Sequence, residues 1–174
     1  IAGASASGSQ PEPPPVVGNA TLRDLQGLLN TTGKIYVYSS SHADKDYADA
    51  EACQYYIPEK KNDTYFLLHM NYSIPSKSKP QTVFAELRSQ DQGRNPYMRE
   101  RMKPGDRAYL DLFLMGYDGI LGCGIFKFYF KGNPHCEVHV REHLVASYHD
   151  ARDNVCRKYQ KEICGDNVYT FYKP

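Results

Sequence analysis

The sequence predicts an all-β fold, a sandwich or a barrel, with one short helix before the strands and one after them. Two observations lead to this fold class. Between residues 34 and 143, segments rich in β-branched and aromatic residues alternate with turn signals such as Pro104-Gly105-Asp106. On either side of this region, apolar residues recur at helical spacing. Short strands joined by such turns are typical of β-sandwiches and β-barrels.

The chain begins with small residues and a proline run over residues 1–18, too polar to bury a core of its own. We therefore expect a disordered tail over residues 1–18 and one folded domain over residues 19–174. Leucines at helical spacing then predict a short amphipathic helix over residues 20–29.

Eight segments follow that have the composition of strands, the fifth more weakly than the others. They are residues 34–41, 52–58, 64–74, 82–87, 95–102, 107–115, 120–130 and 136–143. Residues 150–164 return to helical spacing, with charged side chains on the opposite face, so we expect a helix packed on the outside of the sheet. Residues 167–172 predict one final strand.

Composition and motifs exclude several classes of function. The net charge of +1 gives no field that would attract nucleic acid or an anionic membrane, and no apolar run reaches the roughly 18 residues of a membrane span. No nucleophile elbow or phosphate loop is present, so we expect no enzyme. His139 and His143 lie near Cys136, but four residues of strand separate the two histidines by about 13 Å. We therefore expect neither a metal site nor a cofactor.

Sequons and cysteines indicate a secreted glycoprotein. Four of the eight asparagines stand in Asn-x-Ser/Thr sequons, namely Asn19, Asn30, Asn62 and Asn71. Four of the five cysteines lie in the last third of the chain, where disulfides would join strands to a helix in an oxidising compartment. The odd count leaves one cysteine over, and Cys53 is the expected orphan, unpaired or with its partner missing.

Motifs in the last third carry a resemblance to a known family. They are Gly122-Cys123-Gly124-Ile125, Cys136-Glu137-Val138-His139-Val140, Asn154-Val155-Cys156-Arg157-Lys158-Tyr159, Cys164 and Val168-Tyr169. With these motifs and its order of elements, the chain resembles the tick salivary lipocalins from about Thr21 to Pro174. The resemblance implies an eight-stranded antiparallel up-and-down lipocalin barrel, with a short N-terminal helix and a C-terminal helix packed on the barrel. It further implies a secreted monomer that suppresses host defence.

The resemblance also implies a disulfide pattern. In that family the strand cysteine before the last hairpin pairs with the first helix cysteine, and the cysteine of the following strand pairs with one at the helix end. Carried over, this predicts Cys123–Cys156 and Cys136–Cys164. Cys53 would match a cysteine whose C-terminal partner this sequence lacks, and a Cys53–Cys164 pairing stays open.

The amine-binding members of the family carry an Asp after the first strand cysteine, and Glu-Leu-aromatic on the next strand. Here Gly124 stands in place of that Asp, while Glu137 is kept and is followed by Val138 and His139. One carboxylate and the aromatic wall are thus missing from the motif, which argues against histamine or serotonin as ligand because a buried cation needs compensating charge.

Two other functions remain. The first is a small apolar ligand (fatty acid, eicosanoid or sterol) inside the barrel, unless these side chains simply fill a narrow barrel. The expected lining residues are Tyr36, Tyr38, Phe84, Leu112, Phe126, Phe128, Phe130, Glu137 and His139. The second is binding and inhibition of a host plasma protein, above all a complement component, through exterior loops 93–103 and 42–50. Its expected contact residues are Tyr47, Arg94, Tyr97, Arg99, Arg101 and Lys103. Abundant tyrosine and the basic character of residues 93–103 slightly favour the second.

Overall fold

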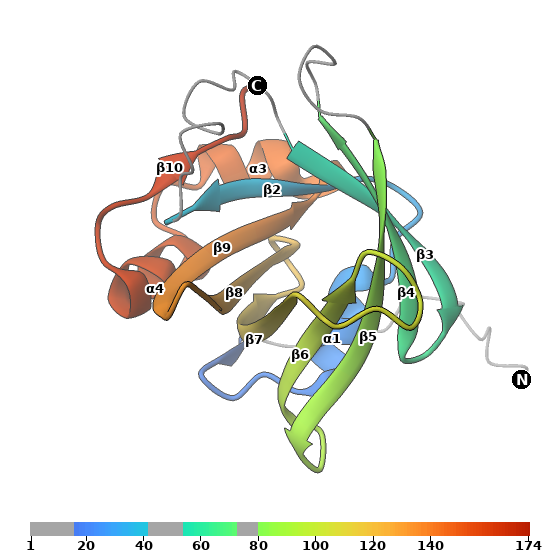
Figure 1. The fold of residues 1–174 in the computed structure, drawn as a ribbon. Helices are drawn as coiled ribbons and strands as arrows, with labels where there is room; N and C mark the ends of the chain where they lie inside the picture. Colours follow the sequence, from blue (N-terminus) through green and yellow to red (C-terminus); the bar gives the residue numbers. More distant parts are fainter. Residues whose placement is uncertain (1–15, 42–53, 73–79) are drawn as a thin grey trace, which may run out of the picture.

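A computed structural model describes residues 16–41, 54–72 and 80–174 and shows a closed, antiparallel, eight-stranded barrel (Figure 1). Each strand pairs with the next along the chain, and the last pairs with the first, as in lipocalins. The barrel strands are β2 (Ile35–Ser40), β3 (Gln54–Asn62), β4 (Tyr65–Tyr72), β5 (Gln81–Asp91), β6 (Arg94–Arg101), β7 (Leu110–Asp118), β8 (Cys123–Phe130) and β9 (Asn133–Arg141). The predicted fold class is confirmed, including the weak fifth strand.

Two short strands pair with the ends of barrel strands. β1 (Val16–Val17) pairs with Tyr117 and Gly116 at the end of β7. β10 (Tyr169–Thr170) pairs with Ser40 and Ser39 of β2. Because β1 already belongs to the sheet, the folded part includes residues before the expected boundary between residues 18 and 19.

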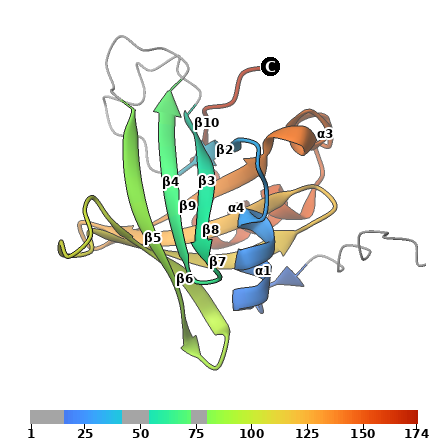
Figure 2. The ribbon, with the colours of Figure 1, turned by 90° about the vertical axis from the view of Figure 1, so that its right-hand side faces the viewer.

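Helix α1 (Leu22–Leu29) closes one end of the barrel, beside the turn that joins β3 to β4 (Figure 2). A capping box starts the helix: the backbone N–H of Asp24 donates to Thr21 Oγ1 at 3.3 Å, and the N–H of Thr21 donates to Asp24 Oδ2 at 2.8 Å. Its buried leucines enter the barrel core, and a Cβ on Gly124 would lie 2.7 Å from Leu28. This end of the barrel is therefore filled by side chains.

Helices α3 (Val145–Asp150) and α4 (Val155–Cys164) follow a single 3₁₀ turn (Glu142–Leu144) and cover the outside of β2, β8 and β9 (Figure 1). Two disulfides fasten α4 to this wall. Cys123 pairs with Cys156 and Cys136 pairs with Cys164, with Cα–Cα distances of 6.6 and 6.1 Å. Both predicted pairs are confirmed. The alternative Cys53–Cys164 pairing is wrong, because Cys164 is bonded to Cys136.

The buried apolar side chains form two clusters, one inside the barrel and one between its wall and helices α3 and α4. Strand β2 contributes to both, so nearly all of its side chains are buried. None of the helices in the described ranges is long and apolar enough to cross a membrane. Tyr47, Cys53 and the whole of the predicted 42–50 loop lie outside the described residues.

Candidate ligand-binding cavity

The end of the barrel away from α1 contains a cavity of about 450 Å³. This volume is within the usual range for small-molecule sites. Its apolar lining comprises Val37, Leu68, Met70, Val83, Met102, Leu110, Leu112, Phe128, Phe130 and Phe171. Its polar lining comprises Gln54, Tyr56, Gln81, Glu100, Tyr109, Glu137 and His139. The cavity thus combines apolar walls with a small set of polar groups.

Glu100 is the most unusual of these polar groups. Strand alternation on β6 turns Met98 and Glu100 inward, and Glu100 is only 8% exposed. The hydroxyl of Tyr109 donates a hydrogen bond to Glu100 Oε2 at 3.0 Å. Burial raises the pKa of Glu100 to about 8, and the nearby Glu137 adds to this rise while the bond from Tyr109 opposes it. Glu100 is therefore mostly a neutral acid at pH 7 in the empty barrel.

A hydrogen-bonded chain runs along the other side of the cavity. The Tyr56 hydroxyl lies 2.9 Å from His139 Nδ1, and His139 Nε2 lies 3.2 Å from Glu137 Oε1. In the tautomer with the proton on Nε2, His139 donates to Glu137 and accepts from Tyr56. Burial raises the pKa of Tyr56 well above its ordinary value, so this hydroxyl stays protonated. These hydrogen bonds fix the position of the Glu137 carboxyl group through His139.

The cavity wall is acidic. Glu100 and Glu137 both belong to it, and among the residues that the structure describes the lining contains no lysine or arginine. A buried carboxylate is costly unless a cation or several hydrogen bonds compensate it. The wall also holds aromatic rings, which attract cations at their faces. The arrangement favours a ligand with a positive head group and disfavours an anionic one.

The structure brings together five of the side chains that the sequence predicted for the barrel interior: Leu112, Phe128, Phe130, Glu137 and His139. Phe126 also points inward, but it lies in the filled part of the core, with its ring 4.5 Å from that of His139. The role of the five cavity residues in binding remains a prediction. Sequence reasoning missed Glu100, Tyr56 and Tyr109. The alternation of Met98 and Glu100 along β6 was the available signal.

Three predicted lining residues lie on the wrong face. Tyr36 and Tyr38 of β2 point outward, where Tyr172 packs on both rings. Arg157 of α4 donates a hydrogen bond to the Tyr38 hydroxyl at 2.8 Å. Phe84 alternates with buried neighbours on β5 and also faces out. These corrections follow from strand alternation, because the neighbouring residues of opposite phase fill the interior.

The predicted basic loop 93–103 is also different, because most of it is strand β6. Arg94 and Arg101 stand at the two ends of this strand, roughly 23 Å apart, and so do not form one patch. Arg99 forms two hydrogen bonds with Asp111, at 3.0 and 3.1 Å. Arg101 pairs with Glu86 at 3.1 Å.

The remaining predicted contact residues of this surface are also accounted for. Tyr97 packs against Phe113 with 4.8 Å between ring centroids. Lys103 lies exposed beyond the end of β6. Two of the four predicted cations are thus neutralised by carboxylates of neighbouring strands, and this surface is less basic than the sequence suggested.

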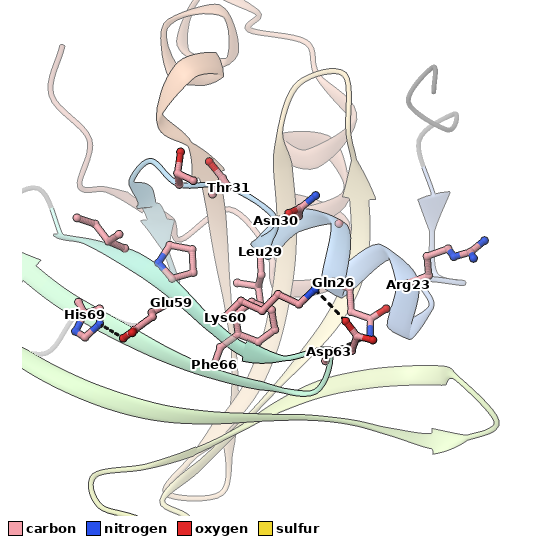
Figure 3. Close-up of a pocket in the computed structure, with 14 residues that line it drawn as sticks. Arg23, Gln26, Leu29, Asn30, Thr31, Glu59, Lys60, Asp63, Phe66 and His69 are labelled. Carbon is pink, nitrogen blue, oxygen red and sulfur yellow. Dashed lines mark hydrogen bonds and ion pairs between the residues drawn. The ribbon is translucent and has the colours of Figure 1, made fainter. Parts of the chain in front are cut away.

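A larger, open groove of about 1,130 Å³ lies between α1 and strands β3 and β4 (Figure 3). Four of its charged side chains form two pairs. Lys60 Nζ lies 2.9 Å from Asp63 Oδ1, and His69 Nε2 lies 2.9 Å from Glu59 Oε2 (Figure 3). Because these four charges already have exposed partners, the groove makes a weaker demand for a ligand than the cavity, where Glu100 is buried and Glu137 is only 20% exposed.

The four sequons lie at the surface to different degrees. Asn19, Asn30 and Asn62 are exposed, whereas Asn71 is half-buried. The Asn62 side chain accepts hydrogen bonds from the backbone N–H and the hydroxyl of Thr64 in the β3–β4 turn. Glycosylation of these sites remains a prediction.

Comparison with known proteins leaves the family open: no protein-family model matches the chain, and no curated protein matches it. The function must therefore be inferred from the chemistry of the cavity. Its acidic wall distinguishes between the ligand classes that the sequence raised.

Proposed function

We propose that this protein binds a small molecule with a protonated amine head and an apolar body inside its barrel. The observation that carries the proposal is the pair of carboxyl groups, Glu100 and Glu137, on a cavity wall whose described residues include no lysine or arginine. An ammonium group between them would compensate charge that is otherwise costly to bury. Leu112, Phe128 and their apolar neighbours would contact the body of the ligand.

This proposal reverses the order of ligands that the sequence suggested. The family motif lacks its aspartate at Gly124, but Leu28 of α1 occupies that part of the barrel, so the position would not reach a ligand there. Glu100 supplies a second carboxyl group from β6 instead. Fatty acids and eicosanoids carry a carboxylate of their own, which the acidic wall would repel. A neutral sterol would bring no positive charge to pair with Glu137 and Glu100.

Inhibition of a host protein through the exterior is the second candidate, and it has less physical support. Arg99 and Arg101 are engaged by Asp111 and Glu86, so an acidic partner would have to compete for them. Charge reversal at these two arginines should weaken a protein partner and leave a barrel ligand unaffected. We further propose secretion, since the two disulfides fit an oxidising compartment, and capture of a host mediator as the biological role.

Calorimetry with three matched probes tests the proposal. At pH 7.5 we expect 2-phenylethylamine to bind, 2-phenylethanol to bind at least about tenfold more weakly, and 3-phenylpropionate not to bind, because only the first carries a cation. Glu137→Gln should weaken amine binding by at least about tenfold. Glu59→Gln is the matched control, since Glu59 lines the groove beside α1 instead of the cavity. Equal binding of the carboxylate probe, or amine binding that Glu137→Gln leaves unchanged, would contradict the proposal.

A further inference from the structure

We propose that capture of the amine is coupled to release of a proton from Glu100, which is neutral in the empty barrel and ionised in the complex. This inference rests on the proposed function, because it requires a cationic ligand in the cavity. Glu100 would then select for a positively charged ligand and set the pH range in which that ligand is bound.

The geometry around Glu100 supports this exchange. Glu100 lies on β6 and accepts a hydrogen bond from the hydroxyl of Tyr109, which directly precedes β7. The other titratable groups among the described lining residues are Tyr56 on β3 and Glu137 and His139 on β9. Both ring nitrogens of His139 already have partners within this group. No lysine or arginine from residues 16–41, 54–72 or 80–174 lines the cavity to neutralise Glu100, so within this part of the chain a proton is the available compensating charge in the empty cavity.

An ammonium group in the cavity would offset the two effects that keep Glu100 protonated, burial and the nearby Glu137. Burial and the proximity of Glu137 raise its pKa to about 8, since each disfavours a second negative charge in the cavity. A cation placed between the two carboxyl groups attracts the ionised form of both. The carboxylic acid then loses its proton to solvent, the ammonium pairs with the carboxylate, and the charge of the cavity and ligand together falls by one.

The number of protons released follows from the state of the empty barrel. With a pKa of about 8, about 90% of Glu100 is protonated at pH 7, so binding should release about 0.9 proton per ligand. Only about 1% of Glu100 is ionised at pH 6 and about half at pH 8. If the complex requires the ionised form throughout, affinity should be about 50-fold higher at pH 8 than at pH 6. The protein would hold its ligand at neutral to alkaline pH and release it in acid.

The test measures 2-phenylethylamine binding by calorimetry at pH 6, 7 and 8. At pH 7 it is repeated in phosphate and in Tris, whose different ionisation enthalpies give the number of protons released. The wild type should release about 0.9 proton and gain about 50-fold in affinity from pH 6 to 8. Glu100→Gln should release almost none and change less than about threefold, since Glu137 remains to pair with the amine. His139→Gln, the control for the other titratable side chain on that wall, should keep most of the pH dependence.

A ligand-free measurement supports the same test. In the wild type, the ¹³C resonance of the Glu100 carboxyl should titrate near pH 8 in the empty protein and at a lower pH with amine bound. Titration near 4.5 in the empty protein, or a pH dependence that Glu100→Gln retains, would overturn the inference. Amine binding without proton release would overturn it and leave the proposed function standing. Absence of amine binding at every pH would overturn both.

Discussion

Replacing Glu100 with glutamine should stabilise the barrel relative to the wild type, and this gain in unfolding free energy should grow as the pH rises. The group is an acid whose pKa is about 8 in the folded protein and about 4.5 when exposed, so the folded state binds its proton more tightly. Below pH 4.5 both states are protonated, and Glu100 imposes no penalty. Between about pH 4.5 and 8 the unfolded chain loses this proton while the folded protein keeps it, so stability falls as the pH rises.

The magnitude follows from these two values. Each pH unit within this window costs about 1.4 kcal/mol, and the penalty grows by about 3 kcal/mol from pH 5 to pH 8. Glutamine has a similar shape and cannot ionise, so Glu100→Gln should remove this pH dependence. The difference in unfolding free energy between variant and wild type should therefore increase by about 3 kcal/mol over the same range.

Urea denaturation with the disulfides intact, at pH 5, 6, 7 and 8, measures this difference. Glu162→Gln on the exposed face of α4 is the control, and it should leave the pH dependence unchanged. A difference between Glu100→Gln and wild type that stays constant from pH 5 to 8 would refute the reasoning, because Glu100 would then not be protonated in the folded barrel.

Three further predictions concern the wall and the closed end of the barrel. Gly124→Ala should lower the unfolding free energy by about 1–3 kcal/mol in urea denaturation, because the added methyl would meet a leucine of α1 at 2.7 Å; an unchanged midpoint would show that α1 shifts freely. Replacing both Cys136 and Cys164 with serine should cost about 3–4 kcal/mol in the same assay, since their bond closes a 28-residue separation; a loss below about 1 kcal/mol would contradict this. Tyr109→Phe removes the hydrogen bond that lowers the pKa of Glu100, so the NMR titration midpoint of that carboxyl should move upward, and a downward shift would be inconsistent with the hydrogen bond.

Much of the fold could be predicted from the sequence, because the strands are separated by strong turn signals. Residues 95–102 were the weakest strand segment, and they form β6. The disulfides were predicted through the resemblance, and the structure has the same pairs, Cys123–Cys156 and Cys136–Cys164. The strands depend on local composition, which the sequence displays directly, whereas the cysteine pairs were what the resemblance implied.

The direction of side chains was harder to predict where both faces of a strand are apolar. Helices α3 and α4 cover the outside of β2, so its outer positions, Tyr36 and Tyr38, carry aromatic residues of the kind expected at interior positions. A pattern of alternating apolar and polar residues is then absent, and the phase of the strand cannot be read. Phe84 on β5 is a different case, because Glu86 shares its phase and marks that face of the strand as the outer one.

Glu100 was missed for a different reason. Its segment carries arginines at alternate positions, which suggested an exposed basic surface, and the carboxyl group between them was not considered as an inward side chain. The arginines instead pair with carboxylates of the neighbouring strands, which satisfies their charge on the outer face. A glutamate that the alternation of β6 turns inward becomes a site candidate only when the tertiary structure shows what surrounds it.

The most direct test of amine capture in the barrel is the position of a bound amine. Nuclear Overhauser effects between the ring protons of 2-phenylethylamine and the methyl groups of labelled protein measure that position. The cavity predicts contacts to Val83 and Leu112, which line it. Contacts to Ile57 and Leu29 instead would place the ligand in the groove beside α1 and contradict binding between Glu100 and Glu137.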